Sequence, residues 1–455
     1  MLPLPPVRCP MPSLPEPDRE RMLGQVEELL RDVLTDLEPE PGDVRRGVPG
    51  RPRILPGLCL WAGLVVCVLR GFTSQLSVWR LVSQVGLWFY PRALVTDQAV
   101  YDRLGSGGTA VLERLFGQLS ALLRARLAPY AETTLAPFAT EVAALDESTL
   151  DAVARTLPAL RAVPNGDARL LPGKLTGLFD LRRQQWRAVE HQADPHQNEK
   201  VAARGMLDRL PAWSLVLADL GYFGFAWFDA LTDRHFWWIS RLRKKTSFTV
   251  IHAFYDDGTT FDGLVWLGAH RADRAKHAVR LVSFRVGQTT FRYLTNVTDP
   301  RVLPIVEIAR LYARRWDIEV AFLLIKRHLN LHLLWSAKDG IILQQVWAVL
   351  IIAQLLQALR LEIAGRAGVD PFDVSLALLV QYLPHFAATG QDPVACFIER
   401  GRAAGFIRPS TRTRIQAPAI PRDQFIWPPP DLVLVRTPRY AHRKTRPRTT
   451  TSAVA

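Results

Sequence analysis

The stretch LYARRWDIEVAFLLIKRHL, residues 311–329, contains no proline or glycine and is rich in residues with high helix propensity, so we expect a helix. Four polar side chains on it are spaced 3, 4 and 7 residues apart: Tyr312, Arg315, Glu319 and Lys326. This spacing puts them within roughly a 60° arc of one helix face. Five apolar side chains fall on the neighbouring arc: Leu311, Ile318, Phe322, Ile325 and Leu329. The pattern predicts a helix that buries an apolar stripe and presents a carboxylate, two cations and a phenol together; a surface ladder of ion pairs is the other interpretation.

The composition is that of a basic, globular protein. With 455 residues the chain is long enough for two or three domains, and 48% apolar with 22% charged residues excludes a disordered chain. The net charge of +14 favours a polyanionic partner, nucleic acid before membrane. From Gly401 onward there are eleven lysines and arginines against two aspartates, so the folded body is only modestly basic.

The cysteines indicate a reducing compartment. They are scattered, with no CxxC pair and no histidine at ligand spacing: Cys9, Cys59, Cys67 and Cys396. Neither a disulfide framework nor a zinc site is supported. The Pro-rich N-terminus lacks the basic-then-apolar pattern of a signal peptide, so we expect a cytoplasmic protein.

Two apolar segments raise the question of a membrane span. Residues 54–69 fall short of the roughly 20 residues that a helix needs to cross a bilayer. Residues 346–361 are interrupted by Gln354, Gln357 and Arg360. We therefore expect both segments to be buried helices and expect no membrane partner.

The first third of the chain has a helical pattern. Residues 1–18 are predicted to be a disordered leader, residues 17–36 a short amphipathic helix and residues 38–50 an acidic linker, and helices follow from residue 54 to about 127. Residues 75–89 and 96–104, on either side of a turn at Tyr90 and Pro91, resemble a helix-turn-helix pair in which Thr96 caps the second helix. Plain helical packing fits these residues equally well.

After residue 137 strands and helices alternate. The predicted strands are residues 141–145, 168–171, 175–181, 213–218 and 236–242, and the predicted helices among them are residues 199–210 and 225–231. Residues 246–293 are rich in Val, Thr, Phe and Trp and contain turn signals, which indicates an all-β insertion. Helices resume at Pro304, and the tail from about residue 417 is expected to be extended and mobile.

Two aspartates stand at the ends of predicted strands. Asp146 follows EVAAL, and Asp219 follows LVLA. A carboxylate at the carboxyl end of a buried strand is accessible to a ligand or metal, although a turn-capping aspartate has the same pattern. Together with Glu319 they give the order strand Asp, strand Asp, helix Glu, with the β insertion between the last two. Hard oxygen ligands of this kind suit two Mg²⁺ ions roughly 3.5–4 Å apart.

With these residues in place, the chain resembles the DDE transposases of bacterial insertion sequences, specifically the IS-four group. That group is defined by a Tyr-x2-Arg-x3-Glu-x6-Lys signature, and every spacing is intact in Tyr312, Arg315, Glu319 and Lys326. The supporting matches are Asp146-Glu147-Ser148, Asp219-Leu220-Gly221-Tyr222 and the YLTN segment that ends at Asn296. The resemblance spans residues 145–334.

The resemblance implies an α/β fold: a ribonuclease-H-like catalytic core with an all-β insertion, preceded by a helical N-terminal domain. It implies cut-and-paste transposition, by Mg²⁺-dependent cleavage at transposon ends and strand transfer into target DNA. Asp146, Asp219 and Glu319 would be catalytic and would bind two Mg²⁺ ions, with Mn²⁺ expected to substitute. The implied partners are double-stranded DNA, as terminal inverted repeats and target, and a second copy of the chain, because two ends must be cut together.

The same resemblance assigns DNA contacts. Tyr312, Arg315 and Lys326 would contact phosphates near the cleaved end, which suits the fork of arginine and the point charge of lysine. A basic run after a predicted strand, Arg241, Lys244 and Lys245, is expected to contact the DNA backbone or to be solvated surface. Three aromatics of the insertion are candidates for stacking a flipped base, or else core residues: Trp266, Phe291 and Tyr293.

We therefore predict six segments. They are a leader and linker (1–50), a helical domain that binds DNA ends (51–135), the first part of the core (136–242), the β insertion (243–293), the second part of the core (294–385) and a C-terminal region with a basic tail (386–455). Two other classes of protein stay open. One is a catalytically inactive, transposase-derived DNA-binding protein; the other is a membrane or scaffold protein built on the two apolar segments.

Overall fold

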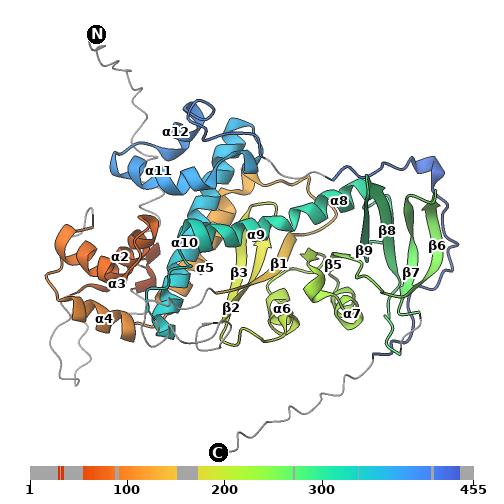
Figure 1. The fold of residues 1–455 in the computed structure, drawn as a ribbon, viewed down its shortest axis with the longest axis horizontal. Helices are drawn as coiled ribbons and strands as arrows, with labels where there is room; N and C mark the ends of the chain where they lie inside the picture. Colours follow the sequence, from red (N-terminus) through yellow and green to blue (C-terminus); the bar gives the residue numbers. More distant parts are fainter. Residues whose placement is uncertain are drawn as a thin grey trace, which may run out of the picture. The chain divides into compact units, whose positions relative to one another are not determined.

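The computed structural model of the protein (Figure 1) describes residues 29–30, 32–34, 55–87, 92–150, 173–269, 272–336, 338–410 and 415–440. The chain divides into two compact units. The first comprises residues 1–125, 329–356 and 375–407, and the second comprises residues 126–328, 357–374 and 408–455. All of the predicted site residues lie in the second unit. The predicted strand at residues 168–171 and the predicted turn at Tyr90 and Pro91 lie outside the described residues.

The first unit is helical, as expected. Its described elements are α2 (Gly57–Leu69), α3 (Gln75–Trp79), a π-helical turn (Arg80–Val85), α4 (Asp97–Ser106), α5 (Ala110–Arg126), the first part of α10 (Asp339–Ala367), α11 (Leu376–Ala388) and α12 (Pro393–Glu399). The Thr96 side chain caps α4 and accepts a hydrogen bond from the amide of Ala99 at 3.3 Å, as predicted. The predicted helix 75–89 is instead an α-helix that passes into a π-helical turn.

Both apolar segments form buried helices. Leu60 and Cys67 of α2 are fully buried. Within the part of the chain that the structure describes, one helix, α10, is long and apolar enough to cross a membrane, and 83% of its most apolar window is buried. Its polar side chains have partners inside the unit, because the amide of Gln354 donates to Ser120 Oγ at 2.8 Å and that of Gln344 to the Leu104 carbonyl at 2.7 Å. Burial of this kind is typical of a core helix.

The second unit is organised around one sheet (Figure 1). Among the described residues its strands are β1 (Val142–Thr149), β2 (Lys174–Asp180), β3 (Gln185–Gln192), β4 (Leu215–Ala218), β5 (Trp237–Arg241), β6 (Phe248–Asp256), β7 (Phe261–Leu267), β8 (Val279–Val286) and β9 (Thr289–Thr295). They lie in the order β3-β2-β1-β4-β5-β9-β8-β7-β6. The first three pair antiparallel, whereas β4 and β5 run parallel to β1. The order 3-2-1-4-5 with these directions is that of a ribonuclease-H-like core, which confirms the expected fold.

Helices cover the two faces of this core. α6 (Glu199–Leu207) and α7 (Phe225–Asp233) pack on the face that carries Ala143 and Leu145 of β1. α9 (Trp316–Leu323) packs on the other face, where Phe322 meets the ring of Trp186 at 4.9 Å between centroids. Because alternate residues of a strand point to opposite faces, Asp146 points toward α9 and Glu147 toward α6.

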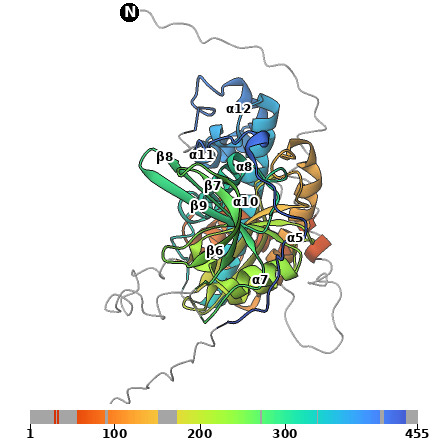
Figure 2. The same ribbon diagram turned by 90° about the vertical axis from the view of Figure 1, so that its right-hand side faces the viewer.

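The β insertion, whose strands β6 to β9 are labelled in Figure 2, extends the core sheet instead of forming a separate one. Its last strand, β9, pairs antiparallel with β5, and β8, β7 and β6 follow outward. The tail runs along this insertion: Ile426 donates to the Phe254 carbonyl at 2.8 Å, and Val435 forms a bridge with His277. The expectation of a mobile tail is therefore wrong at four positions whose backbone groups are bound by the insertion: Ile426, Leu434, Arg436 and Arg439.

Three elements differ from the sequence expectation. β1 does not end at Leu145 but continues through Asp146 to Thr149, because β2 continues beside it. β3 was not predicted, and Gln184, with φ of 54°, makes the preceding turn without a glycine. The predicted helix 311–329 is α8 (Ile305–Arg314), α9 and a π-helical turn (Leu324–His328), because the amide of Arg315 bonds to the Tyr312 carbonyl three residues back.

Candidate active site

The two aspartates meet at the carboxyl edge of the core sheet. β1 and β4 are parallel, and Leu145 pairs with Ala218, so the next residues, Asp146 and Asp219, lie side by side. Asp219 leaves β4 and caps a 3-10 turn, with its Oδ1 accepting from the amide of Gly221 at 2.7 Å. Asp146 Oδ1 accepts from the amide of Glu147 at 2.9 Å. Parallel pairing thus brings together two residues that are 73 positions apart in the sequence.

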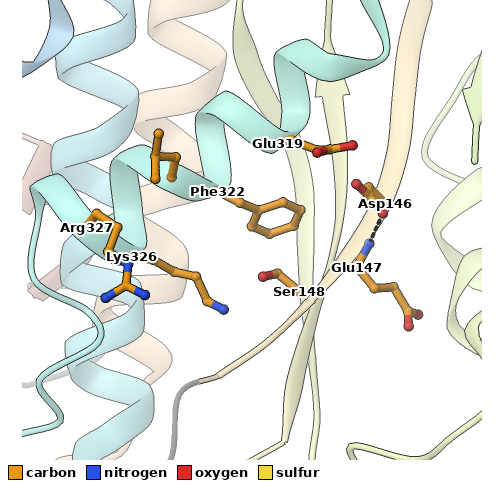
Figure 3. Close-up of a pocket in the computed structure, with 8 residues that line it drawn as sticks. Asp146, Glu147, Ser148, Glu319, Phe322, Lys326 and Arg327 are labelled. Carbon is orange, nitrogen blue, oxygen red and sulfur yellow. Dashed lines mark hydrogen bonds between the residues drawn. The ribbon is translucent and has the colours of Figure 1, made fainter.

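Glu319 approaches this edge from α9. Apolar side chains of α9 anchor the helix on the sheet, since Phe322 lies over Gly177, which pairs with Asp146 in β2. Figure 3 shows the carboxylates of Asp146 and Glu319 pointing toward each other, with Glu147 pointing away. Asp146 and Glu319 line a cavity of about 320 Å³. Its other lining residues are Glu147, Ser148, Phe322, Leu323, Lys326 and Arg327. The predicted strand-and-helix carboxylates therefore face a common space.

Arg315 joins the first and third carboxylates. Its guanidinium lies 2.6 Å from Glu319 Oε1 and 3.5 Å from Asp146 Oδ2, and its side chain is 9% exposed. Burial raises the pKa of Asp146 to about 7; the Glu147 amide and Arg315 oppose this rise, and the charges of Asp219 and Glu319 add to it. The site is thus a cluster of mutually repelling carboxylates in which Arg315 supplies a compensating positive charge.

A buried polar network holds the start of α9 in place. Arg314 binds Asp317 at 2.7 Å, Glu132 at 2.5 Å and the Leu181 carbonyl at 3.2 Å, and Gln184 donates to Asp317 at 2.9 Å. Burial by itself would lower the pKa of Arg314, but the two carboxylates outweigh it and raise the pKa. These residues orient the helix that carries Glu319. Sequence reasoning missed them because every contact except Arg314–Asp317 joins residues more than 100 positions apart.

The other signature residues line the same side of α8 and α9. The Tyr312 ring is 8% exposed and packs on Tyr293 at 5.1 Å between centroids, and burial raises its pKa to about 12. Lys326 lines the cavity beside Glu319 from the π-helical turn. The apolar arc predicted for this stretch is buried throughout: Leu311, Ile318, Phe322, Ile325 and Leu329.

The basic run begins at the same sheet edge. β4 and β5 are parallel with Leu217 opposite Ile239, so Arg241 stands at the end of β5 as Asp219 stands beyond β4. Arg241, Lys244 and Lys245 are all exposed. This places three cations beside the carboxylate edge, where a DNA backbone could contact them, and their contact with DNA stays a prediction.

The three aromatic candidates have different surroundings. Tyr293 is 1% exposed and packs against Phe284 and Tyr312, so it lies in the core. The guanidinium of Arg436 covers one face of Trp266 at 4.6 Å. Phe291 is partly exposed and stacks on Phe284 at 5.6 Å. Of the three, Phe291 is the one whose ring is neither buried nor covered by a cation in the structure.

The donor chemistry of the site suits a hard cation. Carboxylate oxygens on two strands and a helix are the ligands that Mg²⁺ and Mn²⁺ prefer. With the side chains as they stand, no three His, Cys, Asp or Glu residues in the described part of the chain are close enough to hold a metal ion. Arg315 contacts both Asp146 and Glu319, so its guanidinium supplies positive charge beside these two carboxylates.

Comparisons with known proteins agree with this geometry. Residues 154–356 match the family of the transposase DDE domain, a stretch that includes Asp219 and Glu319 and begins after Asp146. The protein y4zB of Sinorhizobium fredii, described as a transposase, is 28% identical over 145 residues, which are 30% of this chain and 40% of that protein. Transposase InsG of insertion sequence element IS4 of Escherichia coli is 26% identical over 178 residues, 37% of this chain and 39% of that protein. The matched regions thus span about two fifths of each relative.

Residues 154–356, less than half of the chain, are thus similar to the transposase DDE domain, and this stretch holds most of the core sheet described above. The two matched relatives are described as transposases, which supports the predicted resemblance to the DDE transposases of bacterial insertion sequences. Membership of the IS-four group stays a prediction. Among solved structures, a piggyBac transposase synaptic complex with hairpin DNA aligns over 87% of this chain and 85% of that chain, at 8% identity and a TM-score of 0.41. At that TM-score the similarity supports no conclusion about the site.

Proposed function

We propose that the chain is a DNA transposase that cuts at transposon ends and joins them to target DNA in a reaction that requires divalent cations. The observation that carries this proposal is that Asp146 and Glu319 line one cavity and that Asp219 follows the strand parallel to β1, beside Asp146. That arrangement matches the order of carboxylates expected of the DDE mechanism. The substrates would be the terminal inverted repeats and the target duplex.

Asp146, Asp219 and Glu319 would hold two Mg²⁺ ions, with Mn²⁺ able to substitute. When bound, such ions lower the pKa of the attacking water or 3′-hydroxyl and stabilise the leaving oxygen. Arg315 would move from the two carboxylates to a phosphate of the DNA, keeping its charge paired in both states. Burial of Asp146 and Arg315 excludes water and strengthens each of these interactions.

Cations around the cavity would position the DNA. Lys326 lines the cavity itself, and Arg241, Lys244 and Lys245 stand at the adjoining strand end. Tyr312 would act through Arg315, whose guanidinium lies 6.0 Å from the centre of its ring. We further propose a homodimer on paired DNA ends in the bacterial cytoplasm, because cut-and-paste transposition needs both ends cut together.

Glu319→Gln should remove Mg²⁺-dependent nicking of a DNA fragment that carries the element's own ends, because glutamine is a poor metal ligand of the same size. Wild-type protein should nick the fragment, and both proteins should bind it. Equal nicking by the two would show that Glu319 is not a ligand. Binding without nicking by either would support the inactive DNA-binding alternative.

Lys326→Ala should weaken end binding and lower the slope of log K against log salt by about one unit, because one phosphate contact is lost. The measurement is a salt titration of binding to the same DNA end. Lys276→Ala is a matched control, since this lysine is paired with Asp233 at 2.7 Å on the insertion. An unchanged slope for the Lys326 variant would place that residue away from the DNA.

A further inference from the structure

The start of α6 brings one more carboxylate to the sheet edge. Asn198 caps this helix by accepting from the amide of Lys200 at 3.0 Å, and Glu199 is its first residue. A methyl group on Gly221 would lie 2.1 Å from Glu199 Oε2 and 2.9 Å from Asp219 Oδ1. The two oxygens are therefore about 5 Å apart or less, and two ligands of one divalent cation lie roughly 3–5 Å apart.

Gly221 makes this approach possible. Any side chain at that position would overlap the Glu199 carboxylate, so the glycine leaves a cradle between Glu199 and Asp219. Burial raises the pKa of Glu199, and the charges of Asp219 and Glu147 raise it further. The carboxylate is thus held near two like charges in the described structure.

A buried hydroxyl lies within electrostatic range of the same carboxylates. Tyr222 is 1% exposed, and its hydroxyl oxygen has no hydrogen-bond partner among the residues that the structure describes. Burial raises its pKa well above the usual value, and four carboxylates raise it further: Glu147, Asp146, Glu199 and Asp219. A buried hydroxyl is normally satisfied by protein or by ordered water, so this orphan indicates a ligand or its hydration shell beside the carboxylates.

The two lysines near Glu199 oppose the rise in its pKa, and both also bind other groups. Lys174 binds Glu147 at 2.6 Å and the Gln197 carbonyl at 2.5 Å, and Lys200 donates to the Phe223 carbonyl at 3.1 Å. The competing explanation for Glu199 is a first-turn carboxylate that favours the helix dipole. That explanation accounts for its place at the start of α6 but not for the cradle at Gly221 or for the orphaned hydroxyl.

We propose that Glu199 is a fourth carboxylate of the metal site, which shares a divalent cation with Asp219, and that the Tyr222 hydroxyl bonds to water on that cation. The proposal rests on the proposed function, because it adds a ligand to the site formed by Asp146, Asp219 and Glu319. It assigns to α6 a direct part in holding the metal.

The test is Mn²⁺ binding to the full-length protein without DNA, measured by calorimetry and by the electron paramagnetic resonance of free Mn²⁺. Glu199→Gln should weaken Mn²⁺ binding about tenfold, and Tyr222→Phe about threefold. Gly221→Ala, which displaces the Glu199 carboxylate without changing charge, should also weaken binding. Glu190→Gln, an exposed carboxylate on β3, is the matched control and should bind as the wild type does.

The outcomes separate this proposal from the proposed function. If Asp219→Asn loses Mn²⁺ binding while Glu199→Gln and Gly221→Ala bind as the wild type, the fourth ligand is wrong and the three-carboxylate site stands. If the wild type binds no Mn²⁺, both proposals fail. Weakened binding by Glu199→Gln with no change in Tyr222→Phe would overturn the part assigned to the hydroxyl. Metal-free unfolding temperatures equal to that of the wild type would show that the variants are folded.

Discussion

Asp219→Asn is expected to reduce cleavage of transposon-end DNA by about 1,000-fold or more, which corresponds to ~4 kcal/mol of transition-state stabilisation. Asp219 stands beside Asp146 at the strand ends, so in the proposed site its charge would help to hold the divalent cations. Asparagine keeps the oxygen that accepts from Gly221, so the 3-10 turn should survive. The measurement is single-turnover cleavage with saturating Mg²⁺.

End binding should be unchanged in the same variant, because the residues proposed to contact phosphates are Lys326 and the basic run, not Asp219. Glu190→Gln serves as the control for a lost carboxylate and should cleave at the wild-type rate. Retained cleavage with lost binding would contradict the assignment of Asp219.

Arg280→Met is expected to lower the free energy of unfolding by about 3–5 kcal/mol, because it leaves a charge buried without its partner. The side chains of Arg280 and Asp262 are both 0% exposed and form a bidentate salt bridge with distances of 2.7 and 2.6 Å. Arg280 also donates to the Leu303 carbonyl at 2.6 Å. The pair ties β8 to β7 and to the segment that leads into α8. Urea unfolding of the purified protein gives the measurement.

Two controls isolate the cause. Replacing both partners, with Arg280→Met and Asp262→Leu together, should restore much of the stability, because no unpaired charge is left buried. Arg234→Met removes an exposed partner of Asp208 and should change stability by about 1 kcal/mol or less. A double variant as unstable as the single one would show that the loss comes from packing and not from the charge.

The three carboxylates could be predicted because their signals are local. Strand patterns ended near Asp146 and Asp219, and parallel strands bring such ends to one edge of a sheet. The signature spacing placed Tyr312, Arg315 and Glu319 on one helix face, and Arg315 does contact Glu319. The insertion was visible from its β-branched and aromatic residues, and its strands are where the composition placed them.

The remaining features depend on contacts that no local pattern shows. β3 is rich in polar residues and follows a turn that lacks glycine, so it carries no strand or turn signal. At the break, the Arg315 amide bonds to the Tyr312 carbonyl three residues back, and the neighbouring Arg314 is bound by Glu132 and Asp317. Glu199 sits next to Asp219 only because α6 packs back on the sheet.

The aromatic candidates show a similar limit. Trp266, Phe291 and Tyr293 were chosen because they lie in the insertion, but their rings differ in exposure. Tyr293 is buried in the core, and Phe291 is partly exposed. A strand alternates between faces, so two aromatics at positions i and i+2 share a face yet differ in depth according to what covers each one. The sequence does not show which residues pack over each ring.

The most direct test of the metal-site claim is the metal dependence of cleavage by Asp219→Cys. A thiolate is a soft ligand that accepts Mn²⁺ more readily than Mg²⁺, so a direct ligand position should switch metal preference. We predict that the variant cleaves transposon ends at least about 100-fold less than wild type with Mg²⁺ and recovers much of that loss with Mn²⁺. Two results would contradict metal ligation by Asp219. One is cleavage by the variant at the wild-type rate in Mg²⁺. The other is an equal loss of cleavage rate in Mg²⁺ and in Mn²⁺ by a variant that is folded and still binds DNA.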